Sequence, residues 1–258
     1  MGKDAILLIS FGTTYDETRE KTINNIEKAI SEKYPSYALV QAYTSSMIIR
    51  SLSKRGMKIF NVKEALQKLV DDGIENLHIQ STHIICGDEY EKMLRMVSEY
   101  EDKFKTITVG KPLFADYSDV ETFTNIISKA FPLEEDEALV LMGHGTEHEI
   151  NKVYEEIKAE FDKKGFQNIL VGTVEAKPDI EDIIEALKEI KPKKVKLTPL
   201  MLVAGDHATN DMAGDEDDSW KAIIANEGIE VEVILKGLGE YEEIRTIYMN
   251  HLEESMKK

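Results

Sequence analysis

Short apolar runs alternate with helix-patterned segments along this 258-residue chain, and this alternation constrains the fold more than any other feature. Eight runs have the length and apolar content of buried strands, at residues 5–9, 37–43, 77–80, 106–109, 138–142, 168–174, 194–200 and 230–235. Between them, apolar residues recur at the spacing of an amphipathic helix, as in residues 62–70 and 180–190. Repeated strand–helix alternation is typical of parallel sheets covered by helices on both faces. We therefore predict an α/β fold.

The eight expected strands divide into two sets of four that resemble each other. Blocks of the first half match blocks of the second half in the same order: residues 7–13 (LLISFGT) with 140–146 (VLMGHGT), 38–44 (ALVQAYT) with 169–175 (ILVGTVE), and 83–89 (HIICGDE) with 201–207 (MLVAGDH). Such matches predict two similar lobes, each with a four-stranded parallel sheet flanked by helices. The expected domains are residues 1–133 and residues 134–258. The alternative is that any two strand–helix halves share this likeness.

Charge and motif content exclude several classes of function. The net charge of −17 argues against binding to nucleic acid or anionic membranes, because basic surface supplies the affinity for both. The single cysteine, Cys86, fits a reducing cytoplasm, and no apolar run is long enough to span a membrane. Glycine-rich nucleotide loops, serine-hydrolase elbows and zinc-protease motifs are absent from the sequence. We therefore expect a cytoplasmic protein with no nucleotide or organic cofactor.

Polar side chains follow three expected strands of the second half. His144 follows the fifth strand, Glu175 follows the sixth, and His207 comes shortly after the seventh. Ligands of parallel α/β sheets bind outside the carboxyl ends of the strands, so we expect these three side chains to lie together. Two imidazoles and a carboxylate suit a divalent transition metal such as Co²⁺, Fe²⁺ or Ni²⁺, and they equally suit acid–base chemistry. The second lobe is therefore expected to carry the metal and catalytic residues.

Each of the three residues also has a structural alternative. His144 lies between two glycines and could simply belong to a tight turn. Glu175 could be an acid that stabilises a helix N-terminus, and His207 could be an exposed loop residue. Their counterparts in the first half are Phe11, Thr44 and Glu89. At these matched positions the imidazoles therefore occur only in the second half, and Glu89 is the one acid that the first half offers.

Charged residues form two clusters whose roles the sequence leaves open. Residues 47–63 contain no acid and carry five cations: Arg50, Lys54, Arg55, Lys58 and Lys63. This segment either binds the carboxylates of an acidic small molecule or forms a solvated helix face. An acidic run beginning at Asp211 follows His207, and it either attracts metal cations or forms a solvated loop.

Several blocks together resemble the signatures of anaerobic cobalt chelatases of the CbiK type. In the first half these are residues 10–13 (SFGT), 44–50 (TSSMIIR) and 83–92 (HIICGDEYEK). In the second half they are residues 142–145 (MGHG), 174–175 (VE), 199–207 (PLMLVAGDH), 210–212 (NDM) and 218–221 (DSWK). The resemblance covers nearly the whole chain. It implies a class II chelatase fold, with two similar α/β lobes and a cleft between them.

The resemblance also implies a reaction, the insertion of Co²⁺ into sirohydrochlorin with release of two protons, in anaerobic cobalamin biosynthesis. Co²⁺ is then a substrate, and the tetrapyrrole is the expected partner. Carried over block by block, His144 and Glu175 are the implied catalytic pair, and His207 joins them as a metal ligand. The expected substrate-binding residues are Ser10, Phe11, Gly12, Thr13, Arg50 and Glu89, with Lys54 and Arg55 as further candidates for the carboxylate rim.

Two alternatives stay open at this point. One is an iron or nickel chelatase acting on a related tetrapyrrole, because the types of ligand atom alone do not select among these metals. The other is a non-enzymatic metal or tetrapyrrole carrier, which needs the binding residues but no proton acceptor. The sequence leaves the oligomeric state undetermined.

Overall fold

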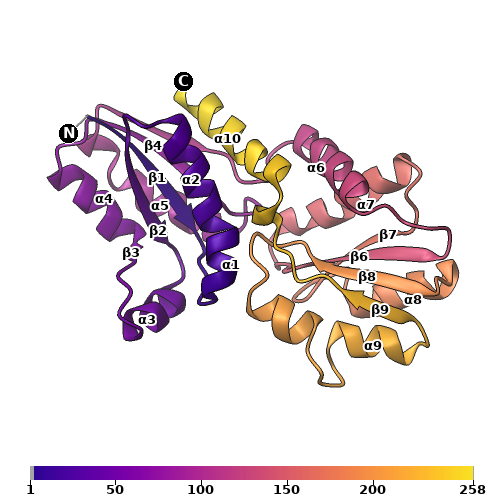
Figure 1. Ribbon diagram of the computed structural model, residues 1–258. Coiled ribbons are helices and arrows are strands. Elements are labelled where there is room, and N and C mark those ends of the chain that lie inside the picture. The colour runs from indigo at the N-terminus through magenta and orange to yellow at the C-terminus, as the bar shows by residue number, and fades with distance from the viewer. Residues whose placement is uncertain (1–2, 258) are drawn as a thin grey trace. The chain divides into compact units, whose positions relative to one another are not determined.

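A computed structural model describes residues 3–257, and contacts along the chain divide it into two compact α/β units. The first unit contains the chain up to Ala115 together with the segment from Gly239 onward, and the second contains Asp116–Leu238. Each unit is built on one parallel sheet flanked by helices (Figure 1). The predicted α/β class is confirmed.

The first unit has a five-stranded sheet in the order β3-β2-β1-β4-β5. Its strands are β1 (Asp4–Ser10), β2 (Ala38–Tyr43), β3 (Phe60–Asn61), β4 (Asn76–Ser81) and β5 (Thr106–Gly110). Its helices are α1 (Asp16–Lys21), α2 (Ile23–Lys33), α3 (Ser46–Lys54), α4 (Val62–Asp71), α5 (Asp88–Ser98) and α10 (Glu242–Met256), with a short 3₁₀ turn at Glu101–Lys103.

The strand β1 lies at the centre of this sheet and is buried on both faces. Every residue from Ala5 to Ile9 is fully buried, as expected of a strand between two helical layers. Apolar residues of α4 and α5 pack against one face of the sheet. The helix α4 begins with a capping box, in which Asn61 and Glu64 each accept a hydrogen bond from the other's backbone amide.

The second unit has a four-stranded sheet in the order β7-β6-β8-β9. Its strands are β6 (Glu137–Gly143), β7 (Ile169–Thr173), β8 (Lys194–Pro199) and β9 (Glu230–Val233). Its helices are α6 (Tyr117–Ala130), α7 (Val153–Lys163), α8 (Ile180–Ile190) and α9 (Trp220–Asn226), with a 3₁₀ turn at Glu149–Lys152 and a π-helical turn, η3, at Ala208–Met212. The helices α6 and α7 lie on one side of the sheet, and α8 and α9 lie on the other (Figure 1).

The two sheets share one strand order. The strand order β2-β1-β4-β5 in the first unit has the same topology as β7-β6-β8-β9 in the second. This agrees with the block matches that pair residues 7–13 with 140–146 and residues 83–89 with 201–207. The first sheet differs by one further strand, β3, which contributes only the two pairs Ala42–Phe60 and Tyr43–Asn61. The expected four-stranded first sheet therefore gains a short edge strand.

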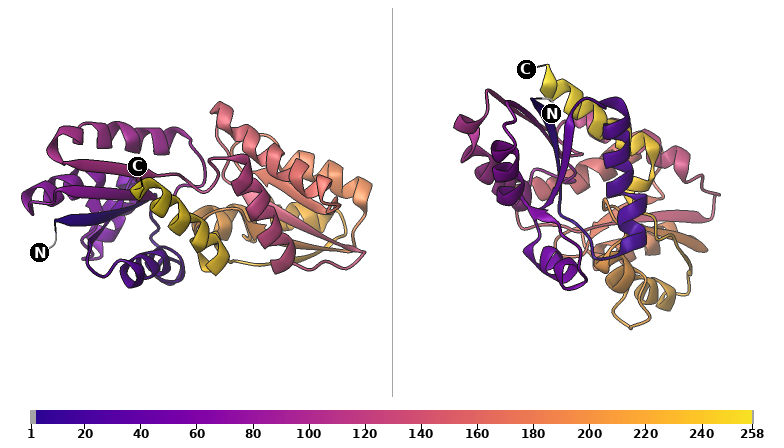
Figure 2. Two further views of the ribbon diagram at one scale, coloured as in Figure 1. Left: turned by 90° about the horizontal axis from the view of Figure 1, so that it is seen from above. Right: turned by 60° about the vertical axis from the view of Figure 1, so that its left-hand side comes forward.

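The observed division of the chain differs from the expected boundary after residue 133. The helix α6 packs against α7 and so belongs with the second unit. The helix α10 packs against β4 and β5 of the first unit. In both figures this yellow helix lies beside the indigo and purple elements of that unit (Figure 1, Figure 2). Tyr248 of α10 is fully buried and donates a hydrogen bond from Oη to the Thr82 carbonyl, 3.1 Å away. The first unit is thus completed by residues that follow the whole second unit.

Within residues 3–257, no helix has both the length and the apolar character needed to cross a membrane.

We expect Leu252→Ala to destabilise the first unit by about 2–5 kcal/mol, because this fully buried α10 side chain would leave a cavity against the sheet. Chemical denaturation followed by circular dichroism measures the change. The fluorescence of Trp220, the chain's single tryptophan, monitors the second unit separately. The matched control is Asn250→Ala on the exposed side of the same helix, which should stay within about 0.5 kcal/mol of the parent protein. Equal stability of both variants would contradict the packing of α10 on this sheet.

Candidate metal centre

Three side chains of the second unit meet at the carboxyl edge of its sheet. His144 follows β6, Glu175 follows β7, and His207 follows β8. One ligand atom from each lies within 4.8 Å of the other two. The strands β6 and β8 are neighbours whose connections run in opposite directions across the sheet, which is where α/β folds open a ligand crevice. The structure therefore brings together the three residues that the sequence selected.

Two glycines fix the backbone around His144. At Gly143, a Cβ would lie 2.4 Å from Cε1 of Tyr154, so only glycine lets the strand approach that ring. Gly145 has φ +86°, and a Cβ there would lie 2.7 Å from Thr173 Oγ1 and 2.9 Å from the Ala176 amide nitrogen. The Gly-His-Gly sequence thus holds the His144 loop tightly against β7 and α7.

Tyr154 of α7 packs against the loop that carries His144. Its side chain is only 2% exposed. Burial raises the pKa of Tyr154 to about 12, against the opposing effect of hydrogen bonds from the backbone of Gly145 and His144. The phenol is therefore neutral, and its oxygen lies against the amides of the loop. Sequence reasoning missed this residue because the helical pattern of α7 marks Tyr154 only as a core position.

Backbone hydrogen bonds join the loops that carry His144 and Glu175. The Glu175 amide donates to the His144 carbonyl at 2.8 Å, and the Val174 amide donates to the Gly143 carbonyl at 3.0 Å. The side chains are also close, with 3.4 Å between His144 Nδ1 and Glu175 Oε2. His144 Nδ1 lies 3.2 Å from the Gly145 carbonyl oxygen as well. The imidazole and the carboxylate therefore form one local unit.

His207 completes the group from the loop after β8. Its ring meets that of His144 edge to face, with 4.6 Å between ring centroids and 68° between planes. Asp211 Oδ2 lies 2.6 Å from His207 Nδ1. Sequence reasoning placed Asp211 in an acidic run and in the 210–212 block of the family resemblance, but gave it no contact with His207. The spacing of four residues between His207 and Asp211 could have indicated that contact.

Partial exposure leaves the three side chains accessible to a ligand. The exposed fractions are 46% for His144, 54% for Glu175 and 33% for His207. Two imidazole nitrogens and one carboxylate oxygen can hold a divalent transition metal with coordination positions left open. Open positions permit rapid exchange of the ion, whereas a closed four-ligand site would retain it. The same groups can accept protons.

Four of the predicted residues of the first unit, residues 10–13, lie at the end of β1, at the carboxyl edge of that unit's own sheet. Ser10 and Thr13 are buried, and their hydroxyl oxygens accept hydrogen bonds from Thr82 Oγ1 at 2.8 Å and from the Tyr15 amide at 3.2 Å. Phe11 between them is 47% exposed. Gly12 has φ +101°, and a Cβ there would lie 2.4 Å from the Tyr43 ring. This segment is therefore a fixed loop that presents one aromatic side chain.

Glu89 and the basic segment lie elsewhere in the first unit. Glu89 is in the first turn of α5, with Oε1 3.3 Å from Lys92 Nζ, and its Oε2 is buried with no hydrogen-bond partner among residues 3–257. Arg50 and Lys54 are exposed on α3, and no ion pair of the described chain involves either. Arg55 instead binds Asp16 and the Thr14 carbonyl. Lys58 is likewise exposed and outside every ion pair of the described chain, although its Nζ lies 5.5 Å from the centroid of the Phe60 ring. Arg50, Lys54 and Lys58 are thus the exposed cations of this segment that no ion pair occupies.

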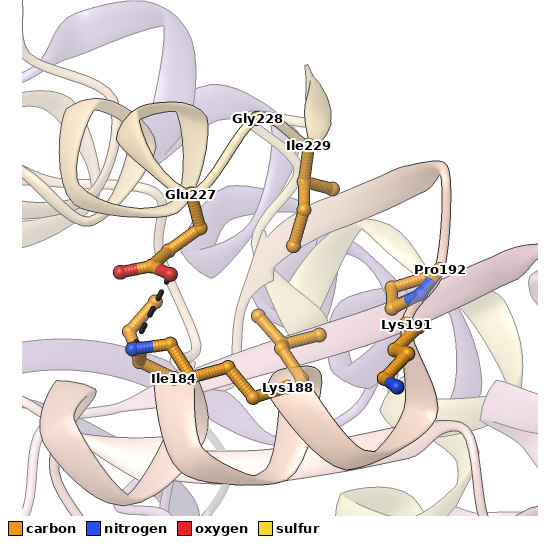
Figure 3. Close-up of a pocket in the computed structure, with 8 residues that line it drawn as sticks. Ile184, Lys188, Lys191, Pro192, Glu227, Gly228 and Ile229 are labelled. Atoms are coloured by element: carbon orange, nitrogen blue, oxygen red, sulfur yellow. Dashed lines mark ion pairs between the residues drawn. The ribbon is translucent and has the colours of Figure 1, made fainter.

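A separate pocket of about 300 Å³ lies between the end of α8 and the loop before β9 (Figure 3). Its apolar wall includes Leu187 and Ile229, and an ion pair of 3.3 Å joins Lys188 to Glu227 across it. None of the residues predicted from the sequence to form a site lines it. Because α8 ends where β8 is about to begin, this pocket is at the amino edge of the sheet, away from the histidines.

Comparison with known proteins gives one consistent result. Residues 4–257 match the cobalt chelatase (CbiK) family. A sirohydrochlorin cobaltochelatase of Salmonella typhimurium is 40% identical over 256 residues, covering 98% of this chain and 97% of the relative. The sirohydrochlorin cobaltochelatase CbiKC of Nitratidesulfovibrio vulgaris is 33% identical over 256 residues, covering 98% and 90%. The structure of SirB from Bacillus subtilis with Fe³⁺ shares the fold, with a TM-score of 0.66 at 13% identity, covering 98% of this chain and 96% of that one.

We expect Gly145→Ala to reduce both the stability of the second unit and its affinity for Co²⁺, because the new Cβ overlaps Thr173 and displaces the His144 loop. Gly165→Ala is a matched control, since Gly165 has nearly the same φ, +87°, but nothing lies within 4 Å of its Cβ position. Both variants incur the backbone cost of roughly 1–2 kcal/mol, and Gly145→Ala should cost about 1–3 kcal/mol more from overlap. Denaturation and Co²⁺ titration check this. Equal effects of the two variants would show that the contacts of Gly145 are unimportant.

Proposed function

This chain belongs to the cobalt chelatase (CbiK) family, and we propose that it inserts Co²⁺ into sirohydrochlorin at the site formed by His144, Glu175 and His207. The observation that carries the proposal is the meeting of two imidazoles and a carboxylate, partly exposed, in a chain that matches sirohydrochlorin cobaltochelatases over 98% of its length. The protein is a metal chelatase, and Co²⁺ is its substrate.

The site holds the metal before insertion and receives protons afterwards. Co²⁺ binds to the two imidazoles and the carboxylate and keeps its remaining positions for water or for the ring nitrogens. Three ligands that are partly exposed bind the ion loosely enough to release it, which matters because tight binding of the ground state would slow transfer. Insertion replaces two pyrrole N–H bonds by bonds to cobalt, so two protons must leave the ring.

His144 is the proposed acceptor of a pyrrole proton, since imidazole accepts protons near neutral pH. Protonation leaves an imidazolium 3.4 Å from the Glu175 carboxylate, measured from Nδ1 to Oε2. This opposite charge stabilises the protonated ring. Glu175 therefore has two roles, as a metal ligand before transfer and as a counter-charge after it. The second proton leaves through Glu175 or solvent.

Substrate binding is assigned to the fixed loop after β1 and to the nearby cations. Phe11 offers an exposed aromatic face to the macrocycle, and Ser10, Gly12 and Thr13 hold the loop that presents it. Arg50 and Lys54 offer cations to the carboxylates on the rim of the ring. Glu89 is proposed as a further polar contact.

The chemistry requires no other cofactor. Metal insertion exchanges ligands and protons without net oxidation or reduction, so no nucleotide or organic redox group is needed. We assign the protein to the cytoplasm, in keeping with its single cysteine and with a tetrapyrrole substrate that carries many charges.

We expect purified protein to accelerate the absorbance change that marks formation of the cobalt complex, measured anaerobically with sirohydrochlorin and Co²⁺ against a protein-free control. His144→Ala and Glu175→Ala should each reduce the rate by about 100-fold or more, because each removes a metal ligand and part of the proton acceptor. Glu185→Ala, an exposed change on α8, is the control. Fe²⁺ and Ni²⁺ assayed in parallel determine the preferred metal. Pigment binding without acceleration would instead indicate a carrier.

We expect Arg50→Met to raise the KM for sirohydrochlorin about tenfold and to leave kcat nearly unchanged, because a charge-assisted hydrogen bond contributes about 1.5 kcal/mol to binding. Lys63→Met removes a cation that already pairs with Glu99 at 2.6 Å and should leave KM unchanged. Steady-state kinetics at two salt concentrations distinguish the two variants. An unchanged KM for Arg50→Met would remove Arg50 from the substrate site.

A further inference from the structure

Asp211 is joined to His207 by the π-helical turn η3. His207 immediately precedes this turn, and Asp211 is its fourth residue. The wide i to i+5 hydrogen-bonding pattern of a π turn is rare and often occurs at functional sites. Here it turns the Asp211 carboxylate back toward the imidazole, with 2.6 Å between Oδ2 and His207 Nδ1.

This contact determines which nitrogen of His207 carries the hydrogen. A carboxylate only accepts hydrogen bonds, so Nδ1 is the protonated nitrogen in the neutral imidazole. Nε2 then keeps its lone pair and is the atom available to a metal. A carboxylate partner also makes the metal-binding nitrogen a stronger electron-pair donor.

The two histidines differ in this respect. His144 Nδ1 faces the Gly145 carbonyl at 3.2 Å and Glu175 at 3.4 Å, and Glu175 is itself one of the three ligands. His207 instead faces a carboxylate outside the ligand group, at a shorter distance. Asp211 therefore remains bound to His207 whether or not Glu175 is occupied with the ion.

The turn that carries Asp211 is firmly anchored. Ala208 and Met212 are fully buried in the core of the second unit. Thr209 donates from its amide and from Oγ1 to the Gly205 carbonyl, at 2.9 and 2.8 Å. The Gly214 amide donates to the Asn210 carbonyl at 3.0 Å, and a Cβ on Gly214 would lie 2.3 Å from that oxygen. The orientation of His207 is thus set before any ion arrives.

We infer that Asp211 is a positioning residue, which holds His207 in the Nδ1–H tautomer and directs Nε2 to the incoming ion. That this ion is the Co²⁺ to be inserted rests on the proposed function. The rival interpretation is that Asp211 only adds negative charge, together with the exposed acids at residues 215–218.

Asp211→Asn is the discriminating variant. The amide has nearly the shape of the carboxylate, but its NH₂ group can donate to Nδ1 and so favour the opposite tautomer, a change that disables histidines held by aspartate elsewhere. Asp215→Asn removes the same charge from a side chain that is 97% exposed and paired with Lys221. Asp211→Ala removes the contact without offering a donor. Trp220 fluorescence and thermal unfolding verify that each variant is folded.

Two measurements use the whole 258-residue chain without tetrapyrrole. Long-range ¹H–¹⁵N NMR of the metal-free protein should show His207 as the Nδ1–H tautomer, with the Nε2–H form increased in Asp211→Asn. Titration with Co²⁺ should give a Kd raised about 10- to 100-fold in Asp211→Asn and Asp211→Ala, and changed less than about twofold in Asp215→Asn. During turnover, KM for Co²⁺ should rise while KM for sirohydrochlorin stays constant.

An unchanged tautomer and an unchanged Kd in Asp211→Asn would overturn the inference. Equal weakening by Asp215→Asn would also overturn it, in favour of a general charge effect. A different result would contradict the proposed function. If the parent protein binds Co²⁺ with the predicted dependence on Asp211 but does not accelerate insertion, the positioning role stands and the chelatase reaction does not.

Discussion

Parallel pairing of β6 with β7 and β8 is the interaction on which the candidate metal centre depends. The register places Gly143 opposite Thr173 and Met142 opposite Pro199, so three segments that are distant in sequence leave the sheet at one edge. A slip of one residue in either pair would displace one ligand by about 3.3 Å. Metal–ligand bonds are only about 2 Å long, so after such a slip the three side chains could no longer bind one ion together. The burial of β6 on both faces is therefore a functional requirement as well as a source of stability.

The two units show how one topology serves different chemistry. Each sheet presents side chains at the ends of corresponding strands, but the second offers His144, Glu175 and His207 where the first offers Phe11, Thr44 and Glu89. The fold provides the positions, and the residue types at those positions determine what is bound. Under the proposed function, the second unit binds the cation and the first unit contacts the organic substrate.

Sequence reasoning succeeded where periodicity or strand order carries the information. It located eight of the nine strands in residues 3–257, because buried parallel strands are continuous apolar runs. It also selected His144, Glu175 and His207, which the structure brings together because the carboxyl ends of parallel strands converge. The two-residue strand β3 has no such pattern. The helix α10 is recognisable as a helix, but an amphipathic stripe does not say which sheet it covers. The spacing of four residues between His207 and Asp211 is compatible with a contact, but the π turn that forms it has no sequence pattern of its own.

The return of α10 to the first unit has a consequence for biosynthesis. The second unit is one uninterrupted stretch, whereas the first is split around it. As the chain emerges from the ribosome, the first sheet must wait for some 120 residues to be made before α10 can cover β4 and β5. The second unit can fold as soon as its own strands are complete. The second unit, which contains the candidate metal centre, is therefore expected to fold first. The first unit, still without α10, stays accessible to chaperones until the chain is finished.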